Sequence, residues 1–170
     1  MRIFTAIDLP DDVRDDLVEG LDALRAARDD LRWVRAENLH LTVRFLGECG
    51  EREVDRQIEH WRERCAAAEP VDLALHGAGC FPHDWMAKVL YAAVDGDQRA
   101  WSQLAGPDAT PHVTLARSRE RVDLTGTVME LSEVRSRTWV ADSVTMYQSF
   151  LERGRAPRYV PVEHFQLGER

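Results

Sequence analysis

Hydrophobic and polar positions alternate with a period of two at the start of the chain. Residues 2–9 (RIFTAIDL) follow this pattern and Pro10 comes next, so the segment predicts a β-strand that ends there. The apolar positions that follow have the spacing of one face of an amphipathic helix: Val13, Leu17, Leu21 and Leu24. We expect Asp11 or Asp12 to cap this helix, and its apolar face to pack on a sheet.

A second strand and a second helix are predicted next. Residues 38–47 (NLHLTVRFLG) alternate, which is typical of a half-buried strand with polar side chains on one face. The polar face carries His40, Thr42 and Arg44. Residues 51–68 return to helical spacing and Pro70 follows them, so this helix is expected to end before the proline.

The rest of the chain is rich in strands. Residues 71–79 and 87–94 predict two strands, joined by a loop that carries Phe81, Pro82 and His83. Further along, we expect one short helix at most within residues 97–105, a strand at 110–117, and strands near 139–149 and 158–167. Short connections favour antiparallel pairing, so an α+β fold with two or three helices on a sheet is expected. No linker interrupts the sequence, which predicts a single domain over residues 1–170.

Composition and charge narrow the classes of function. Acidic residues outnumber Lys and Arg by 30 to 22, for a net charge of −8, which disfavours non-specific binding to nucleic acid or anionic lipid. A phosphate site would therefore have to be built locally. Three cysteines without a CxxC pair favour a reducing compartment. Because neither a signal-peptide pattern nor a membrane-length apolar run is present, we expect a cytoplasmic protein without membrane contact.

A short motif occurs twice. HLTV at residues 40–43 recurs as HVTL at residues 112–115. Within each copy, the period of a strand places the imidazole and the hydroxyl on the same face, about 7 Å apart. Two such strands facing one cleft would supply two imidazoles, from His40 and His112, and two hydroxyls.

These groups suit attack on a phosphorus atom. One neutral histidine can take a proton from water, one protonated histidine can give a proton to the leaving oxygen, and the hydroxyls can bind non-bridging oxygens. Histidine serves in both roles because its ordinary pKa of about 6.5 lies near neutral pH, so a bell-shaped pH profile is expected. The set needs no metal and no other cofactor. By themselves, these residues do not decide which histidine is the acid.

The ordered motifs resemble those of the 2H phosphoesterases, and within them the RNA 2′,3′-cyclic phosphodiesterases of the LigT and ThpR type, formerly called 2′-5′ RNA ligases. The matching segments are RIFTAIDLP at 2–10, WVRAENLHLTVRFLGE at 33–48, GAGCFP at 77–82, PHVTLAR at 111–117, Arg158-Tyr159 and FQLG at 165–168. The resemblance implies a bilobal fold with pseudo-two-fold symmetry, in which antiparallel sheets line a central cleft and helices lie outside.

The resemblance also implies a reaction. It is metal-independent hydrolysis of an RNA-terminal 2′,3′-cyclic phosphate to a 2′-phosphomonoester. His40 would donate a proton to the departing 3′ oxygen, and His112 would activate water. Thr42 and Thr114 would bind the phosphate. The implied partners are RNA ends or nucleotides that carry the cyclic phosphate, and we expect a monomer with no obligate protein partner.

Two further site residues follow the motifs at equal distances. Arg117, five residues after His112, matches a family arginine near the substrate. Strict alternation would send it to the face opposite His112, so a twist or bulge must redirect it. Phe45, five residues after His40, matches an aromatic surface for a base, although a place in the core would also suit it.

Two other functions stay open. The segment between Val94 and Pro111 is shorter than is usual in the family, which would suit a sister enzyme acting on a small cyclic phosphate, such as an ADP-ribose or nucleotide derivative. The other is an RNA-end-binding protein that has lost catalysis, although two intact motifs argue against it.

Three local patterns have two interpretations each. His76, Cys80 and His83 could be metal ligands or part of a polar loop around a buried thiol. Arg44 could contact a second phosphate or form a salt bridge. A group of arginines near the C-terminus could bind RNA backbone or form a solvated turn: Arg153, Arg155 and Arg158.

Overall fold

The computed structural model describes residues 1–168. Its helices are α1 (Asp11–Ala27), α2 (Glu51–Ala67), α3 (Gln98–Ala105) and α4 (Thr125–Glu130), with a 3-10 turn η1 (Ala36–Asn38). Its strands are β1 (Arg2–Asp8), β2 (Arg32–Trp33), β3 (His40–Glu48), β4 (Val71–His83), β5 (Met86–Gly96), β6 (His112–Val122), β7 (Trp139–Ala141), β8 (Ser143–Phe150) and β9 (Arg158–Gln166). The fold is α+β, as the sequence predicts.

The strands form one antiparallel sheet with two matching halves. Its order is β7-β4-β5-β6-β3-β1-β8-β9, and β2 pairs with β6. The halves meet at β3 and β6, which share a single residue pair, Leu41 with Val113. Each half therefore places one HxT strand at the centre and three strands outside it. The expected bilobal, pseudo-two-fold arrangement is present, built on one continuous sheet rather than on separate sheets.

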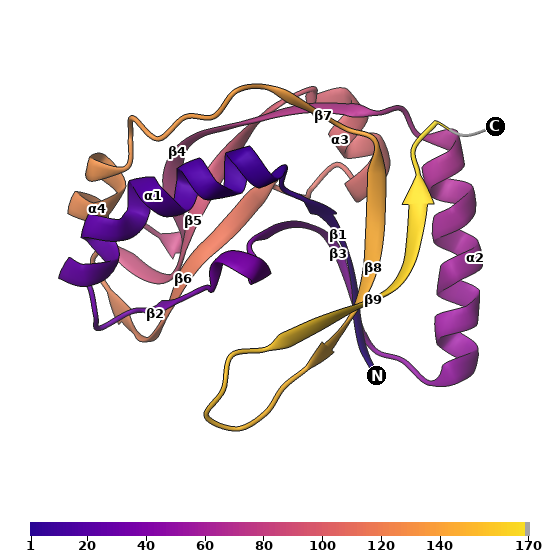
Figure 1. The fold of residues 1–170 in the computed structure, drawn as a ribbon, viewed down its shortest axis with the longest axis horizontal. Coiled ribbons are helices and arrows are strands. Elements are labelled where there is room, and N and C mark those ends of the chain that lie inside the picture. Colours follow the sequence, from indigo (N-terminus) through magenta and orange to yellow (C-terminus); the bar gives the residue numbers. More distant parts are fainter. Residues whose placement is uncertain (169–170) are drawn as a thin grey trace.

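Helices cover the sheet at both ends. Helix α2 runs beside β9 at one end of the molecule and α4 lies beside β4 at the other (Figure 1). The predicted apolar stripe of α1 is buried in the core that also holds the inner face of the sheet. No helix between residues 1 and 168 is long and apolar enough to cross a membrane. The predicted helices at 51–68 and 97–105 are confirmed within one residue at each end.

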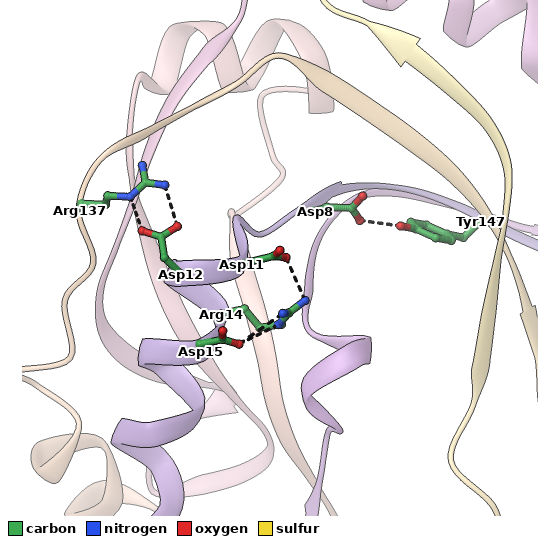
Figure 2. A network of polar contacts seen from close by, with 7 residues as sticks. All are labelled: Asp8, Asp11, Asp12, Arg14, Asp15, Arg137 and Tyr147. Carbon is green, nitrogen blue, oxygen red and sulfur yellow. Dashed lines mark hydrogen bonds and ion pairs between the residues drawn. The ribbon is translucent and has the colours of Figure 1, made fainter.

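The predicted cap of α1 is wrong. Pro10 occupies the N-cap position, and neither Asp11 nor Asp12 caps the helix with its side chain. Asp12 instead accepts hydrogen bonds from Nε and Nη2 of Arg137, at 2.6 and 2.8 Å (Figure 2). This pair ties the start of α1 to the segment before β7. The acidic first turn still complements the positive end of the helix dipole.

The predicted loop at Phe81, Pro82 and His83 is also wrong. Strand β4 continues through His83 and turns at Asp84 and Trp85 into β5. The pairing shifts register between Phe81 and Pro82, and a proline without an N–H is tolerated at such an irregularity. Phe81 is consequently a strand residue. The sequence did not predict the short elements β2, η1 and α4, because a segment of two to six residues shows no clear periodicity of apolar positions.

Candidate functional site

The two HxT motifs lie side by side at the centre of the sheet. Leu41 and Val113, which pair across β3 and β6, are both fully buried. Because side chains alternate along a strand, the polar residues of both motifs point to the other side of the sheet, where they are partly exposed. The structure thus brings together four residues that the sequence predicts: His40, Thr42, His112 and Thr114.

Both imidazoles are anchored in the same way. Nδ1 of His40 lies 2.7 Å from the carbonyl oxygen of Asn38, and Nδ1 of His112 lies 2.8 Å from that of Thr110. A carbonyl oxygen can only accept, so Nδ1 carries the hydrogen in each ring. Nε2 is left to take or give a proton. In neutral His40 this nitrogen accepts a hydrogen bond from the Thr42 hydroxyl at 2.8 Å.

His40 packs against an aromatic cluster from the neighbouring strands. Its ring centroid lies 5.1 Å from that of Phe4 on β1 and 5.4 Å from that of Tyr159 on β9. Phe4 in turn stacks on Tyr147 of β8, at 5.5 Å. These rings hold the imidazole in one orientation and exclude water from one side of it.

Burial and the groups around His40 shift its pKa in opposite directions. Burial is the largest effect and lowers the pKa of the imidazole; the positive charges of His112 and Arg117 lower it further. A backbone hydrogen bond and the negative charge of Asp8 raise it. Asp8 is the β1 residue opposite His40 and accepts a hydrogen bond from the Tyr147 hydroxyl at 2.6 Å (Figure 2). The neutral form of His40 is therefore favoured while no anion is bound.

His112 has a matching aromatic surround. Its ring centroid lies 4.9 Å from that of Phe81 on β4 and 5.4 Å from that of Tyr91 on β5. Gly79 pairs with Tyr91 across β4 and β5, and a Cβ built on Gly79 would lie 2.5 Å from the tyrosine hydroxyl. The absence of a side chain at Gly79 thus gives Tyr91 the space it occupies beside His112.

A bulge in β6 redirects Arg117, as the sequence requires. The pairing of β5 with β6 skips Leu115, so the alternation of side chains reverses after this residue. Arg117 consequently lies on the side of His112. Its positive charge helps to lower the pKa of His40. Burial raises the pKa of Tyr159, and the charge of Arg117 opposes that rise. The charge of Arg117 therefore acts on both His40 and Tyr159.

An equivalent bulge in β3 redirects Phe45. The pairing of β1 with β3 skips Val43. The ring of Phe45 lies 5.9 Å from that of Phe4 and is 67% exposed, so Phe45 is not a core residue. The same bulge turns Arg44 away from the motif. Arg44 donates a hydrogen bond to the carbonyl of Ala105 at 2.8 Å, where the sequence predicts a phosphate contact or a salt bridge, and that prediction is wrong.

A pocket of about 960 Å³ opens beside His40. Its walls come from the η1 segment, the end of β1 and the hairpin of β8 and β9: Asp8, Arg35, Glu37, Asn38, Leu39, His40, Tyr147, Phe150, Glu152, Gly154, Arg155, Ala156, Pro157, Arg158, Tyr159 and Pro161. Arg155 and Arg158 of the predicted arginine group thus line a cavity. Arg153 is exposed outside it, and His112 is not part of its wall.

The pattern His76, Cys80 and His83 does not form a metal site. Nδ1 of His76 lies 2.9 Å from a carboxylate oxygen of Asp95, and His83 stacks on Trp85. Burial raises the pKa of the Cys80 thiol to about 11, so this thiol is protonated near neutral pH. Across residues 1–168, no three His, Cys, Asp or Glu side chains are grouped to hold a metal.

Sequence reasoning missed the aromatic surround, Asp8 and the pocket. One signal was available: Phe4 places a large ring in the phase of the first predicted strand that carries Arg2 and Asp8. Strand alternation places such residues on the same side as the polar ones. Tyr159 and Tyr147 belong to strands whose pairing partners could not be assigned from the sequence.

Comparisons with known proteins agree on one family. A profile described as LigT like Phosphoesterase matches residues 7–91. RNA 2′,3′-cyclic phosphodiesterases from Methanothermobacter thermautotrophicus and Escherichia coli are 28% and 29% identical to the chain. The first alignment covers 98% of this chain and 99% of the relative, the second 98% and 96%.

Solved structures give the same result. A crystal structure from Thermus thermophilus superposes with a TM-score of 0.79 and 26% identity, over 99% of this chain and 98% of that one. Escherichia coli LigT complexed with 3′-AMP superposes with a TM-score of 0.67 and 28% identity, over 98% and 96%. The likeness extends over both halves of the sheet.

Proposed function

Because the chain belongs to the LigT-like phosphoesterase family, we propose that it hydrolyses RNA-terminal 2′,3′-cyclic phosphates to 2′-phosphomonoesters with its two HxT motifs and without a metal. Relatives aligned over nearly the entire chain are named for the phosphodiesterase activity. The observation that carries the proposal is the matched anchoring of the two imidazoles, each with Nδ1 bonded to a carbonyl and Nε2 left for proton transfer.

The proposed reaction balances with two histidines. Water attacks phosphorus in line with the 3′ oxygen, and one histidine takes the proton that this water loses. The new P–O bond forms as the bond from phosphorus to O3′ breaks, and the second histidine gives its proton to O3′. The phosphate stays on O2′, which gives a 2′-phosphate and a free 3′ hydroxyl.

The family resemblance assigns the acid to His40 and the base to His112. The lowered pKa of His40 opposes this assignment only while no substrate is bound. A bound phosphate anion raises the pKa of an adjacent imidazole, so binding of substrate and protonation of His40 support each other. Once His40 is protonated, Nε2 donates to the Thr42 oxygen, and the hydroxyl hydrogen is free to turn toward the phosphate.

The remaining predicted residues would hold the substrate. Thr42 and Thr114 would donate to non-bridging oxygens, and Arg117, redirected by its bulge, would supply positive charge. Phe45 exposes a ring on which the terminal base would stack. We further propose that the protein acts on RNA ends as a monomer; its cytoplasmic location stays a prediction.

A single assay tests this function. Purified protein is incubated in EDTA with a short RNA that ends in a 2′,3′-cyclic phosphate, and the products are resolved as 2′- or 3′-phosphates. We expect a 2′-phosphate that is lost in His40→Ala. Turnover that requires an added metal, or a 3′-phosphate product, would contradict the proposal. Turnover only on a small cyclic phosphate would favour the sister enzyme described above.

A further inference from the structure

The pocket beside His40 extends beyond what hydrolysis of a cyclic phosphate requires. We propose that it binds the nucleotide preceding the terminal one, which makes the protein selective for oligoribonucleotide ends over cyclic mononucleotides. This inference rests on the proposed function and specifies its substrate.

The pocket has the position and size for a second nucleotide. Its volume of about 960 Å³ lies near the upper end of the roughly 300–1,000 Å³ found for small-molecule sites. His40 lines it, so the pocket is continuous with the proposed reaction centre. A chain that carries its cyclic phosphate between the two histidines could therefore place its preceding nucleotide there without crossing solvent.

The hairpin wall of the pocket is anchored to the reaction centre. The side chain of Asn38 donates a hydrogen bond to the carbonyl of Pro157 in the hairpin, at 2.9 Å. The backbone carbonyl of the same Asn38 accepts the Nδ1 hydrogen of His40. One buried residue thus fixes both the imidazole and the turn between β8 and β9, which projects from the body of the molecule (Figure 1).

Aromatic side chains provide surfaces for a base. Tyr147, Phe150 and Tyr159 line the pocket. Stacking on aromatic rings is tolerant of base identity because every base has a π-face. The guanidinium of Arg158 lies over the Phe150 ring at 4.6 Å from its centroid, so the two present a combined planar and cationic surface.

The charges of the pocket leave one cation available. Arg35 pairs with Glu37 at 3.7 Å and Arg155 pairs with Glu152 at 3.4 Å. Among the carboxylates of residues 1–168, none forms an ion pair with Arg158, which leaves this guanidinium as the partner for a phosphodiester. The third acid of the wall, Asp8, is engaged by the Tyr147 hydroxyl. One available cation suits one internucleotide phosphate, which limits the subsite to one preceding nucleotide.

The test compares two substrates with the same terminal base: a nucleoside 2′,3′-cyclic phosphate and a dinucleotide that ends in the same cyclic phosphate. The loss of one aromatic stacking surface costs about 1–3 kcal/mol, which is roughly 5-fold or more. We expect kcat/KM to favour the dinucleotide by at least that factor in the wild type. Arg158→Gln and Phe150→Ala should each bring the ratio of the two kcat/KM values toward one.

Matched controls lie in the same turn. Arg153→Gln removes an equal charge, and Leu151→Ala truncates an exposed apolar side chain; neither residue lines the pocket. Both should leave the ratio unchanged. Equal kcat/KM for the two substrates in the wild type would overturn the proposal, as would an equal loss on both substrates in Phe150→Ala. The second result would place the terminal base in this pocket.

A binding measurement separates failure of the subsite from failure of the proposed function. The Kd of a dinucleotide with a terminal 2′-phosphate is compared with that of the nucleoside 2′-phosphate by calorimetry. Tighter binding of the dinucleotide that is lost in Arg158→Gln supports the subsite even if no cyclic phosphate is hydrolysed. Equal binding of both ligands rejects the subsite even if hydrolysis proceeds.

Discussion

The two halves of the sheet share one plan for holding a histidine. In each, a strand, a helix and an HxT strand follow in order, as β1, α1 and β3 in one half and β5, α3 and β6 in the other. Each imidazole is anchored through Nδ1, and each HxT strand carries a bulge three residues after its histidine. Two aromatic rings pack against each imidazole.

The halves differ in the residues and elements that surround this shared plan. The fifth residue after the histidine is Phe45 in one half and Arg117 in the other, and helix α1 has 17 residues where α3 has 8. The pocket of about 960 Å³ is lined by His40 and not by His112. In-line displacement needs a proton-transfer group on each side of phosphorus, one for the attacking water and one for the leaving O3′. The nucleoside of the substrate, in contrast, lies on one side only. Symmetric proton transfer and asymmetric binding are thus compatible on one sheet.

Removal of either imidazole should abolish most of the proton transfer that the two halves share. His40→Ala and His112→Ala are each expected to lower kcat by about 10²-fold or more, because a positioned acid or base contributes roughly 10²–10⁴-fold. The double variant should lose little beyond the larger single loss, since the two groups act in one step. Turnover assays of all three variants, with circular dichroism to check folding, test this. A wild-type rate in either single variant would exclude the two-histidine mechanism.

The residues five positions after the two histidines, Arg117 and Phe45, should have different effects on activity when they are replaced. Arg117→Gln is expected to cost about 2–3 kcal/mol in kcat/KM on every cyclic phosphate, since it removes a charge-assisted contact to the phosphate. Phe45→Ala should cost about 1–3 kcal/mol, with a size that depends on the terminal base. Substrates with each of the four terminal bases distinguish the two. An equal dependence on the base in both variants would contradict the assignment.

The threonines should give a smaller and unequal effect. Thr42→Val and Thr114→Val are each expected to cost about 1–2 kcal/mol in kcat/KM, the range for one lost hydrogen-bond donor. The loss should be larger at Thr42, because its hydroxyl also contacts Nε2 of His40. Serine at either position retains the hydroxyl and should recover most of the activity. Equal losses at both positions would mean that the contact with His40 has no role in the reaction.

What the sequence could predict depends on how local each feature is. The apolar stripes of α1 and α2 and the two HxT strands follow from spacing along the chain, which is a local property. The need for a bulge before Arg117 followed from spacing together with the family resemblance, which implies that this arginine lies near the substrate. Its position at Leu115 did not, since a bulge is defined by the partner strand. The pocket was not predictable because its walls, the η1 segment and the hairpin at Pro157, are far apart in sequence.

The smallest expected effect concerns pH. Asp8→Asn removes a negative charge that raises the pKa of His40, so this pKa should fall further below its ordinary value. The limb of the bell-shaped profile of kcat/KM that reports His40 should therefore move to lower pH, while the other limb stays in place. The two limbs are set by the lower and the higher of the two histidine pKa values, so the limb that moves shows which of these values belongs to His40.

A pH series of kcat/KM for wild type and Asp8→Asn thus tests the asymmetry of the two histidines directly. Asp22→Asn, an exposed change of the same charge on α1, is the control and should move neither limb. Movement of either limb to higher pH would contradict the effect assigned to Asp8. Movement of one limb alone would identify that limb as the one set by His40, because Asp8 lies opposite His40 in the pairing of β1 with β3.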